Sequence, residues 1–168
     1  METADQPAHP PLHHEETIMI AEPSLLDPAT VYARIRELLN EFYSRDDHGE
    51  SVVDLLEEEA QFVTPLRKAQ GRDAVAALLQ SLAQSREKKG GVGRHFGAKV
   101  NVENLGSGKF RVRSVMIFLS LDSGPGAQGF MNVGDHDDIV AFDSRGACRF
   151  VKRTMTSAAR FTLSPLGN

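Results

Sequence analysis

Apolar residues in the first third of the chain recur at three- and four-residue intervals, which is the spacing of one face of a helix. The residues that follow this spacing are Val31, Ile35, Leu38, Leu39 and Phe42. Asp27 and Pro28 together have the form of a helix start, with a capping residue before a proline at the first helical position. We therefore predict a helix from Pro28 to about Ser44, broken by the polar stretch 45–49.

Two further helices are predicted before residue 90. A short one runs from Val52 to Leu56 and ends in the acidic run 57–59. The other carries an apolar stripe at helical spacing, formed by Val75, Leu78, Leu79 and Leu82. Between these helices, residues 60–64 are predicted as a short strand that ends at Pro65, and residues 68–71 as a turn.

After residue 91 the hydrophobic pattern changes to period two, which predicts strands. Four strands are expected, at about 94–104, 109–121, 129–142 and 147–156, with turns between them. Three helices followed by a four-strand meander predict an α+β fold. We expect a curved antiparallel sheet of four long strands wrapped on three N-terminal helices, in a cone-like shape with an internal pocket.

The second long strand is apolar on both faces in its second half. Phe110, Val112, Met116 and Phe118 mark one face, and Val115, Ile117 and Leu119 mark the other. One face must cover the core, and the other is most economically covered by a second copy of the chain. We therefore expect a homo-oligomer, a dimer or a trimer, with a homodimer through this outer face as the specific expectation.

The 168 residues fit one domain, which we expect to span residues 28–156. Residues 1–27 contain four prolines and only one short apolar run, so they are expected to form a flexible N-terminal tail. Residues 157–168 are expected to form a C-terminal tail.

Composition removes several classes of function. The net charge of −4 argues against a nucleic-acid binder. The one cysteine, Cys148, excludes an internal disulfide and a cysteine-based metal site, and favours a reduced, cytoplasmic setting. The apolar runs are far shorter than the about 20 residues that span a bilayer, so no membrane association is expected. Residues 135–138 alternate between the faces of a strand and cannot converge on one metal ion, so no metal site is predicted.

His95 is the strongest candidate for chemistry. It lies at the start of the first long strand, between Arg94 and Phe96, where the helical part of the chain gives way to the sheet. An imidazole can take and return protons near neutral pH, because its ordinary pKa is about 6.5. A histidine satisfied by local hydrogen bonds is the structural alternative.

Five fragments, in order along residues 28–156, resemble the SnoaL-like branch of the nuclear transport factor 2-like superfamily. They are residues 38–47 (LLNEFYSRDD), 55–62 (LLEEEAQF), 71–75 (GRDAV), 94–95 (RH), and 134–138 (GDHDD) with 148–153 (CRFVKR). Members of this group include scytalone dehydratase, ketosteroid isomerases, polyketide cyclases and a hexachlorocyclohexane dehydrochlorinase, which generally work without a metal or organic cofactor.

The resemblance implies a cofactor-independent lyase or isomerase that acts by proton transfer on a small apolar substrate, aromatic or polycyclic. In the dehydratase and dehydrochlorinase types, a histidine at the Arg-His position pairs with an aspartate just after the first helix. The matching positions here are His95 and Asp47, with Asp46 as the alternative because the register is uncertain by one. A carboxylate that accepts the ring N–H of a histidine fixes its tautomer and raises the basicity of the other nitrogen.

The sequence offers two groups of candidates for the lining of a substrate pocket, one apolar and one polar. The apolar candidates are Phe62, Phe96, Met116, Phe118 and Phe130, for which plain core packing is the alternative. The polar candidates are Tyr43, Asn132 and His136, and His136 could equally lie on the surface. Two positions depart from the group's pattern: Lys99 stands where an asparagine is common, and His136 where a tyrosine is usual.

A non-catalytic function is the second hypothesis. The small subunits of ring-hydroxylating dioxygenases share the expected fold, and residues 62–67 (FVTPLR) are slightly similar to them. The chain would then be a ligand-binding or assembly subunit. Whether His95 and an aspartate meet inside a closed pocket distinguishes the two hypotheses.

Overall fold

The structure of the chain, a computed structural model, describes residues 27–88, 91–121 and 128–163. Its elements in chain order are α1 (Pro28–His48), the 3-10 turn η2 (Val53–Leu55), β1 (Leu56–Val63), β2 (Lys68–Gln70), α2 (Arg72–Glu87), β3 (Val92–Gly106), β4 (Lys109–Leu121), β5 (Gly129–Phe142) and β6 (Cys148–Leu163). Of the predicted N-terminal tail, only Asp27 is among the described residues. Residues 164–168 of the predicted C-terminal tail also lie outside them.

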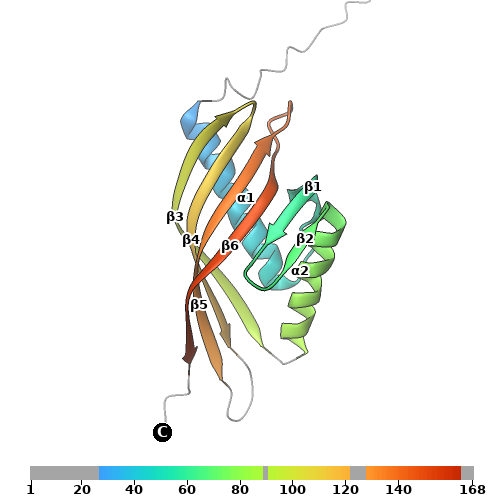
Figure 1. Cartoon of the computed structure of the whole chain (residues 1–168), viewed down its shortest axis with the longest axis vertical. Helices are drawn as coiled ribbons and strands as arrows, with labels where there is room; N and C mark the ends of the chain where they lie inside the picture. Colours follow the sequence, from blue (N-terminus) through green and yellow to red (C-terminus); the bar gives the residue numbers. More distant parts are fainter. Residues whose placement is uncertain (1–26, 89–90, 122–127, 164–168) are drawn as a thin grey trace, which may run out of the picture.

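The strands form one curved sheet in the order β2-β1-β6-β5-β4-β3. All neighbours are antiparallel except β1 and β6, which run parallel. Figure 1 shows α1 lying across one face of the long strands and α2 lying beside β1 and β2. We call the face that α1 covers the inner face and the opposite one the outer face. The predicted α+β class is confirmed, but the sheet is mixed and not purely antiparallel.

The predicted second helix is wrong, so the described chain has two α-helices and not three. The segment is the short turn η2 followed directly by β1, which contains the acidic run 57–59. Leu56 and Ala60 are both buried, and a register shift in β1 lies between Leu56 and Gln61. Val52 and Leu56 are both buried on either side of the 3-10 turn, so a single turn produces the apolar spacing that suggested an α-helix.

The structure has six strands where five were predicted: the short strand predicted at 60–64 is present as the longer β1, and β2 is additional. Residues 68–70, predicted as part of a turn, form β2 on the free edge of β1. The last strand continues to Leu163 and does not end at Thr156, because its partner β5 begins only at Gly129, which pairs with Leu163. Residues 157–163 are therefore part of the sheet and not of a tail.

Helix α1 begins as predicted but ends one turn later. The Asp27 carboxylate caps it by accepting hydrogen bonds from the backbone N–H groups of Ala29 and Thr30. The helix ends at His48, because Gly49 adopts the left-handed conformation with φ of 69° that closes a helix. Asp46 and Asp47 thus lie in the last helical turn and not in a loop.

The core fills only one half of the inner face. Its buried side chains from the sheet include Phe110, Val112, Val140, Phe142 and Phe150, and its helical side chains include Val31, Ile35, Leu38, Leu39 and Phe42. The other half of the inner face holds the residues nearest to His95. Because α1 covers the first half and α2 stands at the side, a hollow remains over the second half.

Candidate active site

One row of side chains crosses four neighbouring strands in the uncovered half of the inner face. His95 on β3 pairs with Phe118 on β4, Phe118 pairs with Asn132 on β5, and Asn132 pairs with Arg160 on β6. Directly paired residues point to the same face of a sheet, so these four side chains share the inner face. They form one wall of a cavity of about 620 Å³.

The cavity wall is mostly apolar. Its apolar side chains are Phe62, Leu66, Leu79, Leu82, Met116, Phe118, Phe130 and Met155, and its charged or titratable ones are Asp46, Arg67, Arg86, His95 and Arg160. Of the residues that the sequence suggested for a pocket, Phe62, Met116, Phe118, Phe130 and Asn132 line it. The size and lining suit a small organic molecule.

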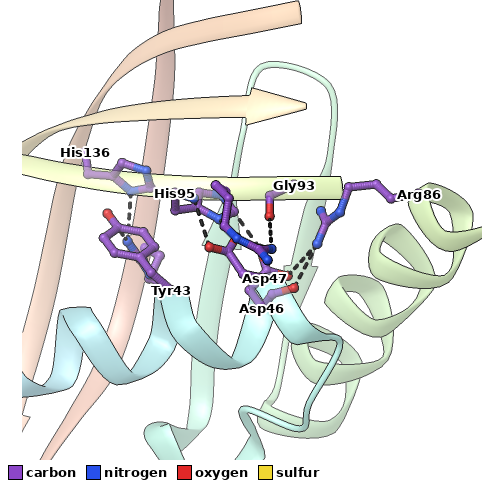
Figure 2. A network of polar contacts seen from close by, with 9 residues as sticks. Tyr43, Asp46, Asp47, Arg86, Gly93, His95 and His136 are labelled. Carbon is purple, nitrogen blue, oxygen red and sulfur yellow. Dashed lines mark hydrogen bonds and ion pairs between the residues drawn. The ribbon is translucent and has the colours of Figure 1, made fainter. Parts of the chain in front are cut away.

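Asp47 holds His95 at two points. One carboxylate oxygen, Oδ1, lies 2.6 Å from the ring nitrogen Nδ1, and the other, Oδ2, accepts a hydrogen bond of 3.0 Å from the backbone N–H of His95 (Figure 2). Burial alone would raise the pKa of the Asp47 carboxyl, but the hydrogen bonds from His95 outweigh it and lower that pKa below its ordinary value. Asp47 therefore stays ionised beside the imidazole.

Asp46 approaches the other side of the same ring. Its Oδ2 lies 3.7 Å from Nε2 of His95, and Arg86 from α2 reaches its Oδ1 at 3.5 Å and its backbone carbonyl at 2.8 Å. Figure 2 shows that the side chains of both aspartates point from the end of α1 toward His95 and that Arg86 extends from α2 toward Asp46. Both alternatives for the predicted acid thus lie against His95, each facing a different ring nitrogen.

Aromatic rings fix the plane of the imidazole. Tyr43 stacks on His95 with centroids 5.2 Å apart and planes 11° from parallel, and Phe118 lies 4.5 Å away. Gly97 makes room for the tyrosine, since a Cβ atom there would lie 3.0 Å from its Cε2. Tyr43 does not line the large cavity. It lies behind His95 and stacks on the histidine ring.

His136 also lies away from the cavity, in a buried polar cluster with Tyr43, Asp138 and Arg153. Arg153 is 1% exposed, and its Nη2 lies 3.2 Å from Asp138, 3.2 Å from Nδ1 of His136 and 3.3 Å from the hydroxyl of Tyr43. Burial and then the Arg153 charge lower the pKa of His136 below its ordinary value. His136 is therefore a neutral acceptor for Arg153, neither on the surface nor in the pocket.

Phe96 is wrong as a pocket residue. It is 54% exposed and pairs with Ile117, whose side chain lies on the outer face. The strand alternation explains the difference, because a residue next to His95 in a strand points to the opposite face.

The arginines that line the cavity were not predicted from the sequence. Arg86 lies in the last turn of α2, and Arg160 lies in the stretch assigned to a tail. Arg67 lies in the turn between β1 and β2. None belongs to a sequence motif that marks a site. Continued alternation of apolar residues to Leu163 was the only signal that could have placed Arg160 on the inner face.

Two structural features are absent from the described ranges 27–88, 91–121 and 128–163. No three or more His, Cys, Asp or Glu side chains come together there in a way that could hold a metal ion. None of the helices in this part of the chain combines the length and the apolar character needed to cross a membrane.

Comparison with known proteins identifies the fold. No protein-family profile and no curated sequence matches the chain. Solved structures do match. A scytalone dehydratase-like protein from Novosphingobium aromaticivorans has a TM-score of 0.67 at 16% identity, over 83% of this chain and 95% of the other. This is the SnoaL-like fold of the nuclear transport factor 2-like proteins.

Further solved structures share the SnoaL-like fold. The type-3 hexachlorocyclohexane dehydrochlorinase LinA from Novosphingobium barchaimii has a TM-score of 0.65 at 13% identity, over 83% of this chain and 94% of the other. ActVI-ORFA from Streptomyces coelicolor has a TM-score of 0.63 at 15% identity, over 80% and 99%. At such identities the likeness concerns the SnoaL-like fold itself.

Proposed function

We propose that this protein is a cofactor-independent lyase or isomerase that uses His95 as a general base. The observation that carries the proposal is the pair formed by His95 and Asp47 at the wall of a largely apolar cavity. A general base needs an orienting acid on one ring nitrogen and access to substrate through the other. The scytalone dehydratase and dehydrochlorinase names of two structural neighbours agree with elimination chemistry on this fold.

In this mechanism Asp47 accepts the N–H of Nδ1, so the lone pair of His95 is on Nε2. That nitrogen removes a proton from a carbon made acidic by a neighbouring carbonyl or leaving group. The imidazolium that forms lies between two carboxylates, since Asp47 is 2.6 Å from Nδ1 and Asp46 is 3.7 Å from Nε2. The proton then returns to a departing hydroxyl or to another carbon, which gives elimination or isomerisation.

Proton transfer by His95 can account for only part of an enzyme's rate enhancement. Positioned general acid–base catalysis is worth about 10²–10⁴-fold. The fixed plane of the imidazole between Tyr43 and Phe118 supports positioning, because the ring cannot swing away from the substrate. The apolar lining favours a substrate with an aromatic or polycyclic body.

Proton exchange tests the proposal without knowledge of the natural reaction. The protein is incubated in D₂O with a panel of bicyclic ketones, and exchange of the protons next to the carbonyl is followed by NMR. We expect exchange above the buffer rate for at least one member of the panel, and its loss in His95→Gln. His48→Gln is the matched control, because His48 is exposed at the end of α1, where its Nδ1 lies 2.7 Å from the carbonyl oxygen of Ser44.

Two results would contradict the general-base proposal. One is exchange that survives in His95→Gln at the wild-type rate. The other is absence of exchange across the whole panel together with tight binding of its members, which would favour the second hypothesis, a ligand-binding or assembly subunit.

A further inference from the structure

The charge of the cavity is opposite to that of the chain. The protein carries a net charge of −4, yet among the described residues the cavity is lined by Arg67, Arg86 and Arg160 and by one carboxylate, that of Asp46. A cavity lined with one sign of charge selects ligands of the other sign. The excess of arginines over carboxylates is confined to the cavity, so its cause is to be found in what the cavity binds.

Among the described residues, only one of the three arginines has a carboxylate as ion-pair partner. Arg86 pairs with Asp46 and stacks over Phe118 at 5.4 Å. For Arg67 and Arg160, no carboxylate of the described residues lies within the 4.0 Å of an ion pair. Two cations at the wall of a mostly apolar cavity thus have no anionic partner in the described part of the chain.

Arg160 is held in a conformation suited to a carboxylate. Its guanidinium carbon lies 4.0 Å above the ring centre of Phe130, itself a cavity residue. A guanidinium stacked on an aromatic ring keeps its N–H groups free at the edge of its plane. Those N–H groups can bind both oxygens of a carboxylate in a planar fork, which a lysine could not do.

Arg67 lies on the same side of the cavity as Arg160. Strands β1 and β6 are parallel, and Val63 at the end of β1 pairs with Thr154. The turn after β1, which carries Arg67, therefore runs alongside the part of β6 that follows Thr154 and leads to Arg160. His95 is at the opposite side, because three strand spacings of about 4.8 Å separate β3 from β6.

We propose that the substrate is an apolar ring system that carries a carboxylate, bound by Arg160 and Arg67 at the end of the cavity away from His95. This inference rests on the proposed function for the identity of the reacting end, and it names the substrate class of the same site. The carboxylate would fix which carbon of the ring system faces Nε2 of His95.

Binding of a matched pair of probes tests the inference separately from catalysis. Naphthalene-2-carboxylate and naphthalene-2-carboxamide have the same apolar body and differ in charge. Calorimetry or ligand-observed NMR at pH 7 and low salt should show the carboxylate binding about tenfold more tightly. The preference should shrink in high salt, which screens exposed charges. It should persist in His95→Gln, so a failure of the catalytic proposal would leave it intact.

The variants Arg160→Gln and Arg67→Gln should each reduce the preference, and the double variant should abolish it, with binding of the carboxamide unchanged. Arg145→Gln, in the exposed turn between β5 and β6, is the control and should behave as wild type. Circular dichroism checks that each variant is folded. Equal binding of the two probes, absence of carboxylate binding at millimolar concentration, or a preference retained in the double variant would each overturn the proposal.

Discussion

The Asp47 carboxylate binds both the ring and the backbone of His95, with Oδ1 2.6 Å from Nδ1 and Oδ2 3.0 Å from the backbone nitrogen. One side chain of α1 therefore fixes the imidazole relative to the strand that carries it. A carboxylate can accept both hydrogen bonds, because both of its oxygens are acceptors. An amide has only one such oxygen.

The first prediction concerns Asp47→Asn. The amide must turn its NH₂ group either toward the backbone N–H of His95 or toward Nδ1. The first arrangement opposes two donors, and the second places the ring proton on Nε2, where the base is needed. We expect kcat to fall by about 10²-fold, less than in His95→Ala, with only a small change in the melting temperature. An unchanged kcat would show that the pair is structural.

The second prediction concerns acid stability and His136. Burial and the Arg153 charge lower the pKa of His136 in the folded protein, whereas in the unfolded chain it binds a proton below about pH 6.5. The unfolded state then binds more protons, so stability is fully present above pH 6.5 and declines as the pH falls below it. The slope from this one group is at most about 1.4 kcal/mol per pH unit.

Urea unfolding at pH 7.5, 6.5 and 5.5 measures this dependence. His136→Asn keeps an acceptor for Arg153 near the place of Nδ1 and cannot take up a proton. The variant should be less stable than wild type at pH 7.5 but should lose less stability at pH 5.5. His48→Asn, at an exposed position, should keep the wild-type slope. Parallel slopes for wild type and His136→Asn would refute the assignment.

The third prediction concerns Cys148. Burial raises the pKa of its thiol to about 12, with the nearby Arg149 opposing the shift. Since only the thiolate reacts, about one molecule in 10⁴ is reactive at pH 8. We expect negligible modification by iodoacetamide or a disulfide reagent in the native state and stoichiometric modification in urea. Fast labelling of the native protein would show that the thiol is accessible and ionised.

The fourth prediction concerns the outer face of the sheet. Val115, Ile117 and Leu119 lie there, and the pairing adds Phe96, Val133 and Met131 beside them. Phe96 is 54% exposed and Phe161, which pairs with Met131, is 49% exposed. So large an apolar surface is expected to pack against a second copy of the chain. Light scattering should give the mass of a dimer.

A charge on this face tests the expected dimer. Phe96→Glu should shift the mass to that of a monomer, because it buries an unpaired carboxylate at the interface. Leu66→Glu is the control: Leu66 is 90% exposed in the turn after β1, away from the outer face. A wild-type monomer at micromolar concentration would rule out the expected dimer.

Local pattern predicted the parts of the fold that depend on local contacts. The apolar face of α1, its cap at Asp27, the stripe of α2 and the four long strands all follow from periodicity and capping rules. Prediction from local pattern failed where a segment pairs with a strand that is distant in the sequence. The segment after Val52 forms a 3-10 turn and then a strand that pairs with β2 and β6, and the length of β6 depends on its pairing with β5.

The candidate site was also predictable only in part, because some of its residues meet through contacts that are distant in the sequence. His95 and Asp47 were named because a family resemblance joined them, and their meeting depends on α1 continuing through its last turn to Gly49. Arg160 and Arg67 were not named, because they line the same cavity only through the parallel pairing of β1 with β6. Phe96 was misplaced because it follows His95 directly in a strand, and neighbouring strand residues point to opposite faces.

The parallel pairing of β1 with β6 has a consequence for how the protein reaches its native state. The paired segments are separated by roughly ninety residues of sequence, so this contact has a high loop-closure cost and is expected to form late. During synthesis, α1, β1 and α2 emerge well before β6. Arg153 and Arg160 both lie on β6. The buried cluster around Arg153 and the cavity wall that includes Arg160 can therefore form only after that strand is in place. The candidate site is therefore expected to be completed late in folding, when β6 pairs with β1.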